Sequence, residues 1–201
     1  MIIFKSINKL NKILENTENT GFVPTMGAIH KGHLSLIDKS NKICKKTLVS
    51  IFVNPKQFNS KNDFINYPRN LTKDLKLLKL NKVDYVLIPK YPDVFRVNNV
   101  KNFKIPKINN ILCAKFRPGH FEGVITVIGN FLSKIYVDKL FLGEKDYQQL
   151  FLIKNFVKKN FKVKIISCKT IRYKNTYALS SRNKRLKKKD LKKLIEISKI
   201  L

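Results

Sequence analysis

Long apolar runs are missing from this sequence of 201 residues. Lys and Asn interrupt the apolar residues of the N-terminal stretch MIIFKSINKLNKIL every few positions. No stretch approaches the about 20 consecutive apolar residues that a membrane-spanning helix needs, and the amphipathic start is unlike a secretory signal peptide. We expect a cytoplasmic protein with no membrane partner. Its hydrophobic share of 43% is sufficient for a folded core.

Cysteine is scarce as well. The three cysteines, Cys44, Cys113 and Cys168, are odd in number and widely spaced, and no two of them form a C-x-x-C pair. This pattern argues against a disulfide framework and against a zinc ribbon. We expect reduced thiols that are mostly buried.

Acidic residues are few: 13 Asp and Glu stand against 42 Lys and Arg, which gives a formal net charge of +29. Such a charge would ordinarily suggest a nucleic-acid or anionic-membrane partner. Only six of the basic residues are arginine, however, and the lysines are spread among abundant Asn, Ile and Phe. A nucleic-acid surface more often gathers arginines with interleaved aromatic residues. We therefore interpret the charge as compositional drift and expect no specific nucleic-acid partner.

Glycine and histidine are also rare, with seven and three residues in the whole chain. All of them fall within residues 21–33, within residues 119–129 or at position 143. These blocks depart from the compositional trend of the chain. They mark the places where we expect chemistry or tight backbone geometry.

The first of these blocks includes Phe22–Leu36, which reads FVPTMGAIHKGHLSL. We expect a strand over Gly21–Val23 that Pro24 ends, then a glycine-bearing turn, then a helix from His33. A helix N-terminus at the carboxyl end of a strand favours anions through its free N–H groups and its dipole. There, His30 and His33 would donate hydrogen bonds to charge that grows on a phosphorus centre.

Two other interpretations of the histidine pair stay open. Either histidine alone could cap a helix or face solvent. An H-x-x-H pair could also bind a metal, but zinc needs at least a third ligand. The chain has only one other histidine and no paired cysteines, so metal ligation is the weaker alternative.

Predicted strands and helices alternate along the rest of the chain. Ser6 is expected to cap a helix that runs to about Glu15, and Thr72 to cap a helix through Leu80. The other predicted strands are Thr47–Val53, Val83–Ile88, Lys139–Leu142 and Val163–Cys168, the other predicted helices are Val124–Ile135, Tyr147–Asn160 and Lys187–Leu201, and residues 90–106 are expected to be irregular. This alternation predicts an α/β fold with a doubly wound parallel sheet.

Polar residues follow two of these strands. Asn54 and Gln57 come after Thr47–Val53, and Gly143–Asp146 comes after Lys139–Leu142. Ligands of open α/β sheets bind at the carboxyl ends of the strands, so we expect these loops to share one edge of the sheet. Neutral amides suit a polar substrate with hydroxyls and a carboxylate. The glycine-bearing loop Arg117–Gly123 carries the third histidine, and a solvated turn explains it equally well.

Six blocks of sequence stand in order between Gly21 and Asn183: PTMGAIHKGHLSLI, SIFVNPKQF, NYPRN, RPGHFEGVITV, LGEKDYQQL and ALSSRN. In this order and spacing they resemble the pantothenate synthetase (pantoate–β-alanine ligase) family, of the HIGH-type nucleotidylyltransferase group. The resemblance implies a Rossmann-like domain over residues 1–183 that binds nucleotide and pantoate, and a homodimer. It also implies a reaction in which ATP and pantoate form pantoyl adenylate and pyrophosphate. β-Alanine then attacks the acyl carbon, which gives pantothenate and AMP.

The resemblance carries roles onto particular residues. The implied ATP-binding residues are Met26, Gly27, Ala28, Ile29, His30, Lys31, Gly32, His33, Gly143, Glu144, Lys145, Asp146, Ile171, Leu179, Ser180, Ser181 and Arg182. Among these, the implied catalytic residues are His33 (the proton donor), His30, Lys145 and Arg182, while Asp146 would bind the ribose and Ile171 would lie against adenine. Gln57, Gln149 and Asn54 would bind pantoate. In the region that holds Mg²⁺ in the family, Asp74 is the one credible ligand.

About one predicted helix follows Asn183. We therefore interpret residues 184–201 as a remnant of the family's smaller C-terminal domain, truncated to about one helix. Because that domain would lie over the active site, and closing a site excludes water from reactive intermediates, we expect slower or leakier overall turnover. Two alternatives stay open: another HxGH nucleotidylyltransferase that acts on a different acid, and an inactive remnant that binds nucleotide or RNA.

Overall fold

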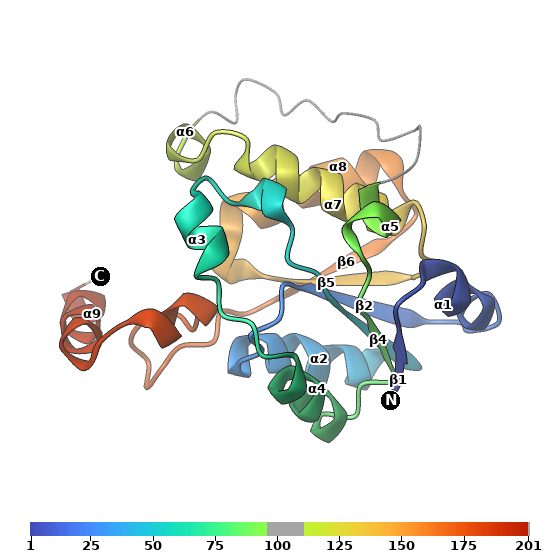
Figure 1. Ribbon diagram of the computed structural model, residues 1–201, viewed down its shortest axis with the longest axis horizontal. Helices are drawn as coiled ribbons and strands as arrows, with labels where there is room; N and C mark the ends of the chain where they lie inside the picture. The colour runs from blue at the N-terminus through green and yellow to red at the C-terminus, as the bar shows by residue number, and fades with distance from the viewer. Residues whose placement is uncertain (96–110, 201) are drawn as a thin grey trace.

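The computed structural model describes residues 1–95 and 111–200 of the chain. Within them, parallel strands form a six-stranded sheet in the order β1-β4-β3-β2-β5-β6 (Figure 1). The strands are β1 (Ile2–Phe4), β2 (Thr20–Thr25), β3 (Lys46–Ile51), β4 (Tyr85–Leu87), β5 (Lys139–Gly143) and β6 (Lys164–Cys168). The predicted α/β fold with a doubly wound parallel sheet is confirmed.

Helices cover both faces of this sheet. The helices of the described residues are α1 (Ile7–Leu14), α2 (Lys31–Ile43), α3 (Lys61–Ile65), α4 (Leu71–Leu80), α5 (Tyr91–Phe95), α6 (Cys113–Phe116), α7 (His120–Leu132), α8 (Tyr147–Asn160) and α9 (Lys188–Ile200), with short 3-10 turns η1 (Pro55–Gln57), η3 (Glu144–Asp146) and η4 (Ser181–Arg185). Helices α2 and α4 lie on one face, and α5, α7 and α8 lie on the other (Figure 1). No helix in the described ranges has the length and apolar character needed to span a bilayer.

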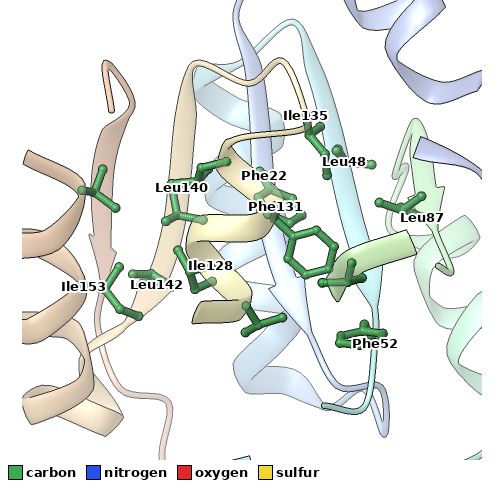
Figure 2. Close-up of a cluster of buried hydrophobic side chains, with 14 of the residues drawn as sticks. Phe22, Leu48, Phe52, Leu87, Ile128, Phe131, Ile135, Leu140, Leu142 and Ile153 are labelled. Carbon is green, nitrogen blue, oxygen red and sulfur yellow. The ribbon is translucent and has the colours of Figure 1, made fainter. Parts of the chain in front are cut away.

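The strands are apolar on both faces because both faces are buried. Neighbouring residues of a strand point to opposite sides of a sheet, so Phe22 packs in the cluster under α7 while Val23 packs in the cluster under α2. Figure 2 shows Phe22 beside Phe131 of α7, and the two rings meet edge to face at 5.6 Å. Continuous apolar runs of this kind are typical of parallel strands between two helix layers.

Several predicted boundaries were wrong. Strand β1 was not predicted; the first helix begins only at Ile7, where Ser6 caps it as expected. Helix α4 is capped by Asn70, whose side chain accepts a hydrogen bond from Lys73 N, and not by Thr72. The predicted irregular segment contains helix α5, and its residues 96–106 lie outside the described ones.

Pro24 does not end the strand that contains it, because β2 continues to Thr25. The carbonyl of Thr25 accepts a hydrogen bond from Phe52 N on the β3 side. Backbone polar groups of successive strand residues point to opposite neighbours, so the backbone nitrogen of Pro24 points to the β5 side. The pairing of β2 with β5 ends at Phe22, and a residue without an N–H therefore loses no ladder hydrogen bond there.

Two further expectations concern the cysteines and the C-terminal segment. Of the three free thiols, only Cys168 is buried; Cys44 is half-buried and Cys113 is exposed, so the expectation of mostly buried thiols was wrong. Helix α9 has no buried residue, and it lies apart from the sheet (Figure 1).

Candidate functional site

A cavity of about 270 Å³ opens where the carboxyl ends of β2, β3, β5 and β6 meet the start of α2, helix α7 and turn η4. Fourteen of the predicted site residues line it: Met26, His30, Gly32, His33, Gln57, Gly143, Lys145, Asp146, Gln149, Ile171, Leu179, Ser180, Ser181 and Arg182. Seven others do not line it: Gly27, Ala28, Ile29, Lys31, Asn54, Asp74 and Glu144. The structure thus brings the predicted loops together at one edge of the sheet.

The turn that precedes α2 is held from below by Asp74 of α4. This carboxylate is 3% exposed, and its two oxygens accept hydrogen bonds from Ala28 N and Ile29 N, each at 2.8 Å. Gly27 and Ala28 both have left-handed backbone, with φ of 75° and 52°. The carboxylate therefore pins a turn that is unfavourable for Ala28. Asp74 thus clamps the turn and is not among the residues that line the cavity, and its role as a magnesium ligand stays a prediction.

The two histidines at the start of α2 form a reciprocal cap. Gly32 N donates to His30 Nδ1 at 3.1 Å, His30 N donates to His33 Nδ1 at 3.4 Å, and the ring centroids lie 4.0 Å apart. A backbone N–H is always a donor, so both Nδ1 atoms accept, and each neutral ring carries its proton on Nε2. The pair thus presents N–H donors from Nε2.

Both imidazoles are neutral at pH 7. Burial lowers the pKa of His30 to about 4, with the charges of Lys184 and Lys145 adding to the effect. Burial lowers the pKa of His33 to about 3, and His30, Lys184 and Lys145 lower it further. A neutral imidazole in this setting is a hydrogen-bond donor, and the role of His33 as the proton donor stays a prediction.

Turn η4 brings Arg182 to the cavity and fastens it. Arg182 forms a two-pronged ion pair with Asp63 of α3, with N–O distances of 2.7 and 3.2 Å, and Arg185 reaches the same carboxylate at 2.7 Å. The hydrogen bond from Arg182 is the largest of the effects that hold the pKa of Asp63 below its usual range. Ser181 Oγ donates to the carbonyl of Ala28 at 3.3 Å, so η4 is joined to the turn before α2.

Asn54 belongs to the scaffold and not to the cavity wall. It is fully buried; its Nδ2 donates to the carbonyl of Gly123 at 3.1 Å and its Oδ1 accepts from Lys56 N at 3.2 Å. A Cβ at Gly123 would lie 2.3 Å from the carbonyl oxygen of Lys56, so only glycine allows α7 to approach η1 this closely. Asn54 therefore fixes η1 against α7, and its role as a substrate ligand stays a prediction.

Sequence reasoning missed other residues of the wall. Arg117 and His120 line the cavity beside Gln57, and His120 Nδ1 donates to the carbonyl of Gln57 at 2.7 Å. Burial lowers the pKa of His120, and the hydrogen bond to Gln57 opposes that shift. The apolar side of the cavity includes Phe52 and the α7 residues Val124, Val127, Ile128 and Phe131. The other unpredicted lining residues include Tyr67, Lys169 and Thr170. Two signals in the sequence marked His120: the rarity of His and Gly, and its place in the block RPGHFEGVITV.

A sequence model of the family Pantoate-beta-alanine ligase matches residues 2–201. The chain is 43% identical to the pantothenate synthetase of Endomicrobium trichonymphae, and the match covers 100% of the chain and 73% of the relative. It is 44% identical to the pantothenate synthetase of Francisella philomiragia, of which it covers 79%.

Two crystal structures resemble this one. The pantoate-beta-alanine ligase of Francisella tularensis, complexed with beta-gamma ATP and beta-alanine, has a TM-score of 0.93 and 42% sequence identity; the match covers 99% of this chain and 78% of that one. The pantothenate synthetase of Thermus thermophilus has a TM-score of 0.91 and 32% identity, with 99% and 72% of the two chains covered.

Proposed function

The chain belongs to the pantoate–β-alanine ligase family, and from this premise we propose how its residues divide the work of the reaction. The enzyme is a ligase that forms the amide bond of pantothenate. ATP and pantoate give pantoyl adenylate and pyrophosphate, and β-alanine then replaces AMP. The observation that best supports these assignments is that the His30–His33 pair lines the same cavity as Gln57 and Gln149.

The phosphates of ATP lie against the first turn of α2 in this proposal. Nucleophilic attack of a carboxylate on the α-phosphorus places negative charge on its oxygens, and preorganised donors lower the barrier by stabilising that charge. The Nε2–H groups of His30 and His33 are such donors. Lys145 and Arg182 supply positive charge, and each exchanges its present carboxylate partner for phosphate oxygens as ATP binds.

The nucleoside occupies the part of the cavity formed after β5 and β6. Gly143 and Lys145 line this part of the wall, Asp146 accepts hydrogen bonds from the ribose hydroxyls, and Ile171 packs against adenine. Residues Leu179–Arg182 close over the phosphates. Turn η4 suits this task because Ser181 already joins it to the turn before α2.

Pantoate lies between Gln57 and Gln149 on one side and α7 on the other. Amide groups match its hydroxyls and carboxylate without adding charge. The apolar side chains of Val124, Val127 and Ile128 suit its branched methyl groups. This arrangement points the carboxylate toward the α-phosphorus, because the amides and the histidines line the same cavity.

Side chains of the described residues do not by themselves form a magnesium site. In the part of the chain that the structure describes, no group of three or more His, Cys, Asp or Glu side chains gathers for a metal ion, and both oxygens of Asp74 accept backbone hydrogen bonds. Mg²⁺ is commonly held by substrate phosphates with one or two carboxylates. In this proposal Mg²⁺ therefore enters with ATP. The family resemblance extends the proposal to a homodimer that acts in the cytoplasm, and sedimentation would measure the mass of the assembly.

Release of pyrophosphate from ATP, with and without pantoate, tests the proposal. We expect release that depends on pantoate and that falls by roughly 10²-fold or more in His33→Ala, because one preorganised donor is lost. Release that responds to another carboxylic acid and not to pantoate would favour a different HxGH nucleotidylyltransferase. Salt-dependent retention on RNA without ATP turnover would favour an inactive binding remnant.

A further inference from the structure

The loop that leads into α7 carries two cavity residues without a task in the adenylation step. One is Arg117, which lines the cavity and is half-buried. Lys145 and Arg182 each have a carboxylate partner, Asp146 and Asp63, whereas Arg117 forms no ion pair with any residue in the described ranges. Its Nε only donates to the side-chain oxygen of Asn59 at 3.4 Å. A half-buried guanidinium without an acid favours a ligand carboxylate.

The other residue is His120, whose ring has the opposite tautomer to the His30–His33 pair. A carbonyl oxygen can only accept, so His120 Nδ1, which lies 2.7 Å from the carbonyl of Gln57, carries the proton. The lone pair of His120 is therefore on Nε2. His120 is 8% exposed and lines the cavity. The cavity thus holds two imidazoles that donate from Nε2 and one that accepts there.

The loop is held rigidly beside Gln57. Asn59 Nδ2 donates to the carbonyl of Pro118 at 2.7 Å, and His120 N donates to the carbonyl of Arg117 at 3.1 Å. Gly119, with φ of 76°, makes the turn that brings Arg117 and His120 to the same cavity. Both residues therefore stand next to the place where the acyl group of pantoate is proposed to lie.

We propose that Arg117 and His120 form the site of the amine substrate: Arg117 binds the carboxylate of β-alanine, and His120 Nε2 accepts a proton from the attacking nitrogen. This inference rests on the proposed function. The reaction has two carboxylates, of which the one on pantoate is consumed by adenylation. The carboxylate of β-alanine survives into the product, so a permanent cationic partner is useful only for it.

The step balances without a further reactant. β-Alanine enters it as the free amine, and the nitrogen lone pair forms the C–N bond to the acyl carbon of pantoyl adenylate. The positively charged nitrogen then loses one proton to His120 Nε2. The bond from the acyl carbon to the phosphate oxygen breaks, and its electron pair leaves with AMP. The carbonyl of Gln57, which already accepts from Nδ1, stabilises the imidazolium that forms.

Two variants separate this role from a structural one. Arg117→Gln removes the cation. His120→Asn keeps an N–H that reaches the Gln57 carbonyl but offers no basic nitrogen, and His120→Gln serves as a second variant if the first does not fold. The matched control is Lys115→Gln, which removes one exposed charge from the same segment but does not line the cavity.

The measurement compares two steps and two nucleophiles. Pantoate-dependent pyrophosphate release reports the first step, and amide formation is followed with β-alanine and with hydroxylamine, an amine that is uncharged at neutral pH and has no carboxylate. We expect Arg117→Gln to raise the KM for β-alanine at least about 10-fold. We expect His120→Asn to slow amide formation about 10²-fold. Pyrophosphate release should stay within about 3-fold of the parent in both variants, and hydroxamate formation should stay within about 3-fold of the parent in Arg117→Gln. His120→Asn should slow hydroxamate formation as well, because the nitrogen of hydroxylamine also loses a proton when it attacks.

Three outcomes would overturn the inference. Equal losses with β-alanine and hydroxylamine in Arg117→Gln, or a matching loss of pyrophosphate release in either variant, would show that these residues only maintain the structure. Unchanged kinetics with β-alanine would show that neither residue acts on it. A parent protein without pantoate-dependent pyrophosphate release would instead refute the proposed function, and this inference with it.

Discussion

Replacing Asp74 by Asn tests how the turn before α2 is held. The carboxylate is buried and accepts from two backbone N–H groups at 2.8 Å. Asn has one acceptor oxygen, so it can satisfy one of the two N–H groups while its own NH₂ group faces the other. A buried donor left without a partner costs ~1–3 kcal/mol, and the remaining hydrogen bond is no longer assisted by charge.

Together these losses should lower the free energy of unfolding by about 2–4 kcal/mol, out of the roughly 5–15 kcal/mol that is typical of a folded domain. In a urea titration the midpoint should fall by about 1–2 M, since unfolding free energies of small proteins change by roughly 1–3 kcal/mol per molar urea. Adenylation should slow by about 10-fold or more, because His30 follows directly on the clamped residues and a small displacement of a reacting group is costly. The matched control is Asp38→Asn, which breaks an exposed ion pair with Lys42 and should change stability by less than ~0.5 kcal/mol.

The Mg²⁺ dependence of activity decides between a clamp and a metal ligand. A clamp predicts lower stability with an unchanged Mg²⁺ concentration for half-maximal activity. If Asp74→Asn kept the urea midpoint of the parent and needed several-fold more Mg²⁺, the clamp would be refuted.

Three further predictions concern other parts of the site. Burial lowers the pKa of His33 to about 3, so below about pH 6.5 the unfolded chain takes up a proton that the native state does not. Between pH 6.5 and 4, urea titrations should show that the parent loses stability relative to His33→Gln by up to ~1.4 kcal/mol per pH unit. Parallel stability profiles of the two proteins against pH would contradict this. Asp63→Asn removes the ion-pair partner of Arg182, so trypsin should cut η4 several-fold faster than in the parent, and an equal cutting rate would show that this pair does not restrain the turn. Gly123→Ala would press a methyl group on the backbone of η1 and should cost about 1–3 kcal/mol, whereas Gly143→Ala, with open space around it, should leave the urea midpoint almost unchanged.

The strands of the central sheet could be predicted because local sequence determines them. Buried parallel strands are apolar on both faces, and Thr47–Val53 and Val83–Ile88 stand out among lysines and asparagines for this reason. Strand β1 could not be found in this way. It has only three residues, two of them exposed, and it pairs only with β4, so its neighbours in space and not its own pattern define it.

Some features of the site could likewise be predicted from local sequence, and others could not. Its loops could be placed at one edge because carboxyl ends of parallel strands meet there. The task of Asp74 could not be predicted, since its hydrogen-bond partners lie 45 and 46 residues away along the chain. The buried role of Asn54 and the place of His120 in the cavity wall likewise depend on the packing of α7 on η1, which no local pattern records.

In the proposed reaction, two neutral imidazoles present Nε2–H donors to the phosphate that is transferred. Nitrogen-15 NMR of histidine-labelled protein measures the protonation of each ring nitrogen directly. The structure predicts that between pH 6 and 8 His30 and His33 carry the proton on Nε2, while His120 carries it on Nδ1. A ring of the His30–His33 pair that is charged in this range, or that carries its proton on Nδ1, would show that the pair does not present these two donors.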